Sequence, residues 1–155
     1  MKQTPRERRI EMRMEEGTLA RDGFLGDDPL RLDRMDVDAR VLADAGISRE
    51  EIGEVLQGLW QRARALMGEA YEPVPGVTVE VGEARGRIPC PFGHPGIYAK
   101  GVMTIEHGDR VLRVSPLSIH MIRSHGFFGG RGSMFRIEPD AAADLVRRLA
   151  APAWQ

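Results

Sequence analysis

The chain has 155 residues, of which 42% are hydrophobic and 29% charged, and its formal net charge is −1. This length allows one genuine core, and the near balance of charge argues against broad, sequence-independent attraction to nucleic acid or to an anionic membrane. A single cysteine, Cys90, excludes an intramolecular disulfide, no apolar run approaches the ~20 residues that span a bilayer, and the first residues lack an apolar signal region, so we expect a cytoplasmic protein.

Three helices are predicted in the first 75 residues, over 5–17, 29–46 and 49–67. The first two begin with a proline directly after a capping residue, and the third follows a capping box at Ser48 and Glu51. Apolar residues of the third helix recur every three or four positions, which gives it one apolar face. A helix-turn-helix that binds DNA is an alternative for the last two helices, but glutamates crowd the end that would approach the phosphates. We therefore expect an ordinary helical hairpin.

The remainder of the chain, 76–155, predicts a small antiparallel sheet with a short helix and a C-terminal helix. Prolines 73 and 75 break the helical pattern, and valines then alternate with other residues in the period of a half-buried strand. We expect strands over 77–81, 98–107, 110–115 and 134–137, a tight turn at Gly108-Asp109, a short helix over 117–124 and a last helix from Pro139. The predicted class is α+β, in which the helical segment 1–75 and the compact unit 76–155 share a core.

Segment 120–136 is dense in glycine, arginine and histidine. Because glycine loses chain entropy on folding and adds no side chain, this density indicates unusual torsions or a close approach of the backbone to something. Successive amides in such a loop can form a concavity for a phosphate or carboxylate, with arginines as charged donors. The spacing matches neither a P-loop nor a dinucleotide fingerprint. The candidate ligand-binding residues are His120, Arg123, His125, Gly129, Gly130, Arg131, Ser133 and Arg136.

A second candidate site combines one sulfur with three imidazoles. Cys90 and His94 lie across a short turn of proline and glycine, and His120 and His125 lie at the end of the predicted short helix. Zn²⁺ accepts this ligand set tetrahedrally. Residues five apart on a regular helix point about 140° away from each other, so both helix histidines reach one ion only if the last turn tightens or unwinds. Without a metal, the four residues would be a buried thiol, a turn residue and two ordinary helix residues.

Three functions remain open from these patterns. The first is a noncatalytic binding or adaptor protein that docks an anionic small molecule or a protein partner at segment 120–136. The second is a zinc-binding protein, structural or hydrolytic, and the third is a single-stranded nucleic-acid binder that stacks bases on whichever of Phe127 and Phe128 is exposed. A Cys90 nucleophile activated by a histidine is a further alternative, but the spacing fixes no proximity between them. No catalytic residue is assigned, and the sequence favours a protein that is not an enzyme.

Overall fold

A four-stranded antiparallel sheet with strand order β1-β2-β3-β4 organises the protein, and helices pack against it. The computed structural model describes residues 3–151. Within that range the elements are α1 (Pro5–Met14), the 3-10 turn η1 (Arg31–Asp33), α2 (Arg34–Ala45), α3 (Arg49–Ala65), β1 (Tyr71–Val74), β2 (Val77–Pro89), β3 (Ile97–His107), β4 (Arg110–Val114), α4 (Pro116–His120), its π-helical continuation η2 (Met121–His125) and α5 (Pro139–Ala150). The α+β class predicted from the sequence is confirmed.

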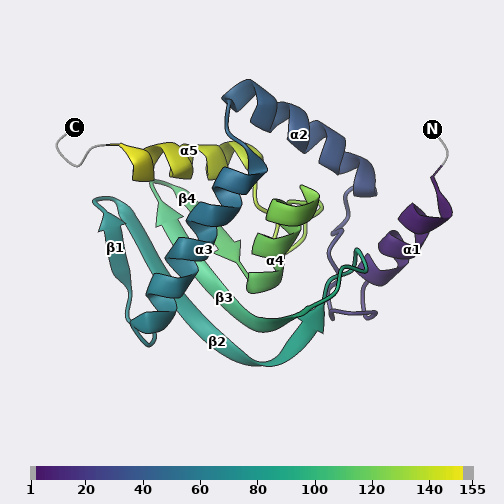
Figure 1. Ribbon diagram of the computed structural model, residues 1–155, viewed down its shortest axis with the longest axis horizontal. Helices are drawn as coiled ribbons and strands as arrows, with labels where there is room; N and C mark the ends of the chain where they lie inside the picture. Colours follow the sequence, from purple (N-terminus) through teal and green to yellow (C-terminus); the bar gives the residue numbers. More distant parts are fainter. Residues whose placement is uncertain (1–2, 152–155) are drawn as a thin grey trace.

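The sheet buries one face through the alternation that the sequence predicts. Val77, Val79 and Val81 are buried on β2 and pair with β3 in continuous antiparallel register, and the β3–β4 hairpin turns at residues 108–109 as expected. The β2–β3 register shifts between Glu83 and Arg87. Such irregularities bend strands, and Figure 1 shows β2 and β3 curving together toward α1. The bend carries the connection between β2 and β3 away from the body of the sheet.

Two groups of buried apolar side chains hold the elements together. The larger joins the sheet to α3, α4, η2 and α5, and includes Ile52, Trp60, Ile105 and Leu145. The smaller joins α1 and the loop after it to the end of β2 and to η2; its buried members are Ile10, Met14, Phe24, Leu25, Leu32, Ile88, Cys90, Phe92, Leu117, Met121 and Phe127. Figure 1 shows α3 crossing the sheet, while α1 lies next to the β2–β3 connection. The smaller group therefore positions that connection.

Helix starts agree closely with the capping patterns, with one exception. The Ser48 capping box forms and α3 begins at Arg49 as predicted. The helix predicted from Pro29 begins only at Arg34, because the Asp28 carboxylate accepts the amide of Leu30 and Arg31 adopts a left-handed φ of 51° that a regular helix does not permit. The first helix also ends earlier than predicted, at Met14. Among residues 3–151, every helix is too short or too polar to cross a bilayer.

Two strand predictions are wrong. The segment read as a break after α3 contains β1, an edge strand in which Pro73 is tolerated and from which the Tyr71 hydroxyl donates to the carbonyl of Leu59 at 3.0 Å. Residues 134–137, predicted as a strand, form a turn at 134–135 followed by irregular chain, and the amide of Arg136 donates to the carbonyl of Ser133. The side chain of Arg136 is drawn inward there by a buried carboxylate, which the local pattern does not reveal.

Candidate metal centre

Cys90, His120 and His125 come together where the end of β2 meets η2. One ligand atom from each residue lies within 4.8 Å of the others, and Cys90 Sγ is 3.6 Å from His125 Nε2. Cys90 follows the last residue of β2 and belongs to the smaller buried group, and the two histidines end α4 and η2. The fold thus assembles three of the four predicted metal ligands, and it brings Cys90 to two histidines that follow it by 30 and 35 residues.

The π-helical winding of η2 brings the side chains of His120 and His125 to the same side of the helix. In a regular α-helix His120 and His125 would diverge, but residues 121–125 adopt the wider π-helical winding. The amide of Gly126 donates to the carbonyl of Met121, five residues back, and Gly126 ends the helix in a left-handed conformation with φ 68°. The two imidazole centres are consequently 5.1 Å apart. π-Helical turns often occur at functional sites.

Aromatic neighbours fix the planes of both helix imidazoles. Phe92 stacks on His125 with ring centres 4.2 Å apart and an interplanar angle of 8°. Tyr98 stacks on His120 at 4.6 Å and 23°. Ser124 Oγ is 3.3 Å from His120 Nδ1, whereas His120 Nε2 is buried without a hydrogen-bond partner among residues 3–151. A buried ring nitrogen of this kind is a group that a ligand should satisfy.

The fourth predicted ligand, His94, lies beside the other two imidazoles. Its ring centre is 4.8 Å from that of His120 and 5.6 Å from that of His125. His94 is exposed, and it is not part of the close group formed by the ligand atoms of the other three residues. The structure therefore brings all four residues to one place, with three of them inward and His94 on the outside.

Burial tunes the protonation of the inward groups. It lowers the pKa of His125 to about 4, with a further contribution from the neighbouring His120 and His94 rings. Burial also lowers the pKa of His120, and it raises the pKa of the Cys90 thiol. At neutral pH both imidazoles are neutral, as metal ligation requires, while Cys90 carries a proton that a metal must displace. A raised pKa is the opposite of what a thiolate nucleophile needs.

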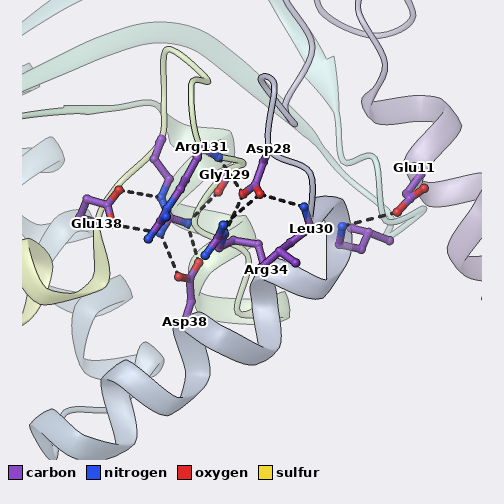
Figure 2. A network of polar contacts seen from close by, with 10 residues as sticks. Glu11, Asp28, Leu30, Arg34, Asp38, Gly129, Arg131 and Glu138 are labelled. Atoms are coloured by element: carbon purple, nitrogen blue, oxygen red, sulfur yellow. Dashed lines mark hydrogen bonds and ion pairs between the residues drawn. The ribbon is translucent and has the colours of Figure 1, made fainter. Parts of the chain in front are cut away.

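Two arginines of the predicted anion site, Arg123 and Arg136, have carboxylate partners within the protein. Figure 2 labels Asp38, Gly129 and Glu138, the residues that accept from Arg136. Arg136 donates to both Asp38 oxygens, at 2.5 and 2.9 Å, and also to Glu138 and to the carbonyl of Gly129. The Arg136 and Asp38 side chains are only 7% and 3% exposed. Arg123 lies 3.7 Å from Glu54 at the surface. Anion binding by these residues stays a prediction, and the hydrogen bonds of Arg136 are already used internally.

The glycine-rich loop approaches the protein's own backbone closely. A Cβ at Gly130 would lie 2.0 Å from the carbonyl oxygen of Leu25, and one at Gly26 would lie 2.3 Å from that of Arg131. Backbone hydrogen bonds join the same segments, and the Arg131 amide donates to Asp28 Oδ2 at 3.0 Å. The close approach predicted from the glycine density is thus present, and its partner is the loop before α2.

Several remaining predictions concern side chains near the loop. Phe127 and Phe128 are both buried, at 1% and 2% exposure, so neither presents the exposed face on which a base would stack. The Ser133 amide donates to the Gly130 carbonyl within a turn, and the Arg131 side chain is exposed. Sequence reasoning did not anticipate the buried acids and bases of this region, namely Asp28, Arg34 and Asp38. In the sequence these charged residues resemble those of a solvent-exposed surface, so no local pattern distinguishes buried charges from exposed ones.

Comparisons with protein-family models, with curated proteins and with solved structures find no match to the chain.

Proposed function

We propose that this is a zinc-binding protein whose ion is held by Cys90, His120 and His125, with His94 as the fourth ligand. The ion joins the β2–β3 connection to η2. The observation that carries the proposal is the convergence of one sulfur and two ring nitrogens within 4.8 Å. This is the second of the functions left open by the sequence, and the geometry favours it over the anion-binding loop.

The spacing of the ligand atoms fits tetrahedral zinc. With Zn–S of about 2.3 Å and Zn–N of about 2.0 Å, tetrahedral geometry separates sulfur and nitrogen by about 3.5 Å. Cys90 Sγ and His125 Nε2 are 3.6 Å apart. The same geometry puts the centres of two ligating imidazoles about 5 Å apart. The three ring pairs formed by His94, His120 and His125 have separations of 4.8, 5.1 and 5.6 Å. Each imidazole is therefore close to the position that a shared ion requires.

The donor set favours zinc over the hard cations. Mg²⁺ and Ca²⁺ prefer oxygen ligands, whereas a thiolate with imidazoles suits zinc. Zinc ligation also needs a reduced Cys90, which agrees with the predicted cytoplasmic location. The inward imidazoles are neutral, and His120 Nε2, which has no hydrogen-bond partner among residues 3–151, supplies a buried lone pair when Nδ1 carries the ring proton. A metal ion would bind that nitrogen and so remove the free-energy cost of burying a polar atom without a partner.

The ion would connect parts of the chain that the smaller buried group also joins. Cys90 and Phe92 belong to the smaller buried group, together with Ile10 and Met14 of α1. His125 directly precedes the glycine-rich loop that packs on the segment before α2. Metal binding is therefore coupled to the position of the N-terminal segment, and the proposed role is noncatalytic.

Metal content and metal-dependent stability test the proposal together. The full-length protein should hold one zinc per chain after reconstitution, and zinc at 100 times its Kd should raise the free energy of unfolding by about 2.7 kcal/mol. Cys90→Ala and His125→Ala should lose this gain. His107→Ala is the matched control, because His107 lies at the far end of β3 and should leave the gain unchanged. Protein without stoichiometric zinc and with no response to a chelator would refute the proposal.

A further inference from the structure

The four proposed ligands differ in how strongly packing restrains their side chains. Cys90 is 3% exposed, and the stacked rings of Phe92 and Tyr98 immobilise His125 and His120. These three ligands lie on the ends of regular elements or directly after them. Three firmly placed protein ligands around zinc leave one coordination position that can change.

His94 faces that position from an exposed turn of the β2–β3 connection. It lies between Gly93 and Pro95, and Gly93 and Gly96 adopt φ values of 80° and 129°. Glycine costs more chain entropy to order than other residues, so holding this turn against the ion is less favourable than holding a helix residue there. The bond from zinc to His94 is consequently the one that opens most easily.

A guanidinium group lies directly under the same turn. Arg13 Nε donates to the carbonyl of Pro91 at 2.6 Å, and a Cβ at Gly93 would lie 3.3 Å from Arg13 Nη2. Among residues 3–151, no ion pair links Arg13 to a carboxylate. Its charge also favours the thiolate form of Cys90, against the larger opposing effect of burial on the pKa.

A second guanidinium flanks the centre from the side of α3. Arg49 Nη1 would lie 2.9 Å from a Cβ at Gly126, directly after His125. Arg49 pairs with the exposed Glu50, and both residues line an open pocket of about 460 Å³ that His125 and Asp36 also border. Glu50 and Asp36 offset the charge of Arg49 there, whereas zinc with one thiolate keeps a single positive charge beside Arg13.

We infer, on the basis of the proposed zinc centre, that His94 is an exchangeable ligand and that a small anion of the carboxylate type takes its place on the metal, held by Arg13. The exchange breaks the bond between zinc and the His94 nitrogen and forms one between zinc and the anion. No atom is oxidised or reduced, and the imidazole moves into solvent. The centre would therefore bind small acids reversibly, at the coordination position on zinc that His94 otherwise occupies.

Cobalt substitution makes the exchange visible. Full-length protein loaded with Co²⁺ should show a thiolate-to-cobalt absorption band, and titration with azide or acetate should change the visible spectrum saturably while that band remains. His94→Ala should bind azide more tightly than wild type, because no imidazole competes, and added imidazole should restore the wild-type spectrum. Arg13→Gln should weaken azide binding by at least about tenfold. Arg9→Gln, exposed on the same helix, should leave it unchanged.

The outcomes separate this inference from the function on which it depends. If cobalt binds with its thiolate band but no anion alters the spectrum, the inference is overturned and the metal site stands. If His94→Ala binds azide no better than wild type, His94 does not occupy the position. If cobalt does not bind through Cys90 at all, the proposed function fails, and the inference fails with it.

Discussion

Zinc binding should release about one proton per ion at pH 8. Burial raises the pKa of the Cys90 thiol, so Cys90 keeps its proton until the metal displaces it. The pKa values of His120 and His125 are lowered, so both imidazoles are neutral at this pH and bind without losing a proton. We therefore expect one proton to be released per zinc ion, and it comes from the Cys90 thiol.

Measurement at pH 6 tests the burial of the imidazoles. An imidazole with the ordinary pKa of about 6.5 is about 0.8 protonated at pH 6 and adds that fraction to the count. With its pKa at about 4, His125 adds only about 0.01. In a His94→Ala variant, which removes the exposed ring, the count should stay well below that of two ordinary imidazoles, because His125 adds almost nothing and the lowered pKa of His120 reduces its share. Two ordinary imidazoles together with the thiol would give about 2.5.

Titration calorimetry in two buffers of different ionisation enthalpy yields the count directly. No proton released at pH 8 would contradict ligation by the Cys90 sulfur. A count near two at pH 8 in the wild type would mean that a zinc-bound water ionises and that His94 is displaced even without added anion. A count near 2.5 at pH 6 in the variant would refute the reasoning that burial keeps the two inward rings neutral.

Three further predictions concern the fold around the centre. Asp38→Ala should lower the free energy of unfolding by up to about 3–5 kcal/mol in urea denaturation, since it removes the buried carboxylate and leaves Arg136 only the half-exposed Glu138; a loss below 1 kcal/mol would contradict that pairing. Gly130→Ala should cost roughly 1–3 kcal/mol because its Cβ would overlap the backbone before α2, whereas Gly58→Ala, with nothing within 4 Å, should stabilise α3 by about 0.5–1 kcal/mol. Zinc-free protein should lose stability as the pH falls from about 6.5 towards 4, because unfolded His125 takes up a proton that the folded form resists; His125→Gln should reduce this loss, and equal pH profiles of the two proteins would argue against it.

The parts of the fold that were predictable are those fixed by neighbours in the sequence. The Ser48 capping box and the Ser115-Pro116 start act within one helical turn, and both form as the pattern indicates. The alternation of valines on β2 likewise reflects local geometry, because one face of the strand is buried. These elements place the ends of β2 and α4, on which the candidate centre depends.

The predictions that failed depend on contacts between distant residues. Arg136 and Asp38 are 98 positions apart, so nothing near residues 134–137 reveals that a buried carboxylate turns the chain there. Arg31 adopts its left-handed conformation within a network that reaches Glu11 on α1. Such contacts are set by tertiary packing, and a single sequence carries no periodicity that would disclose them.

The candidate centre lies between these two cases. The sequence shows its ligand types, one thiol and three imidazoles, and it also shows that the last helical turn must change its winding if both helix histidines are to reach one ion. The direction of that change was not readable, because the π-helical form of residues 121–125 depends on how η2 packs against α3, where Gly53 lies against Arg123. The stacking rings of Phe92 and Tyr98 were equally hidden.

X-ray absorption at the zinc edge of the reconstituted protein tests the central claim most directly. The account predicts one sulfur at about 2.3 Å and three nitrogens at about 2.0 Å. A first shell of nitrogen and oxygen alone, with no sulfur, would contradict it.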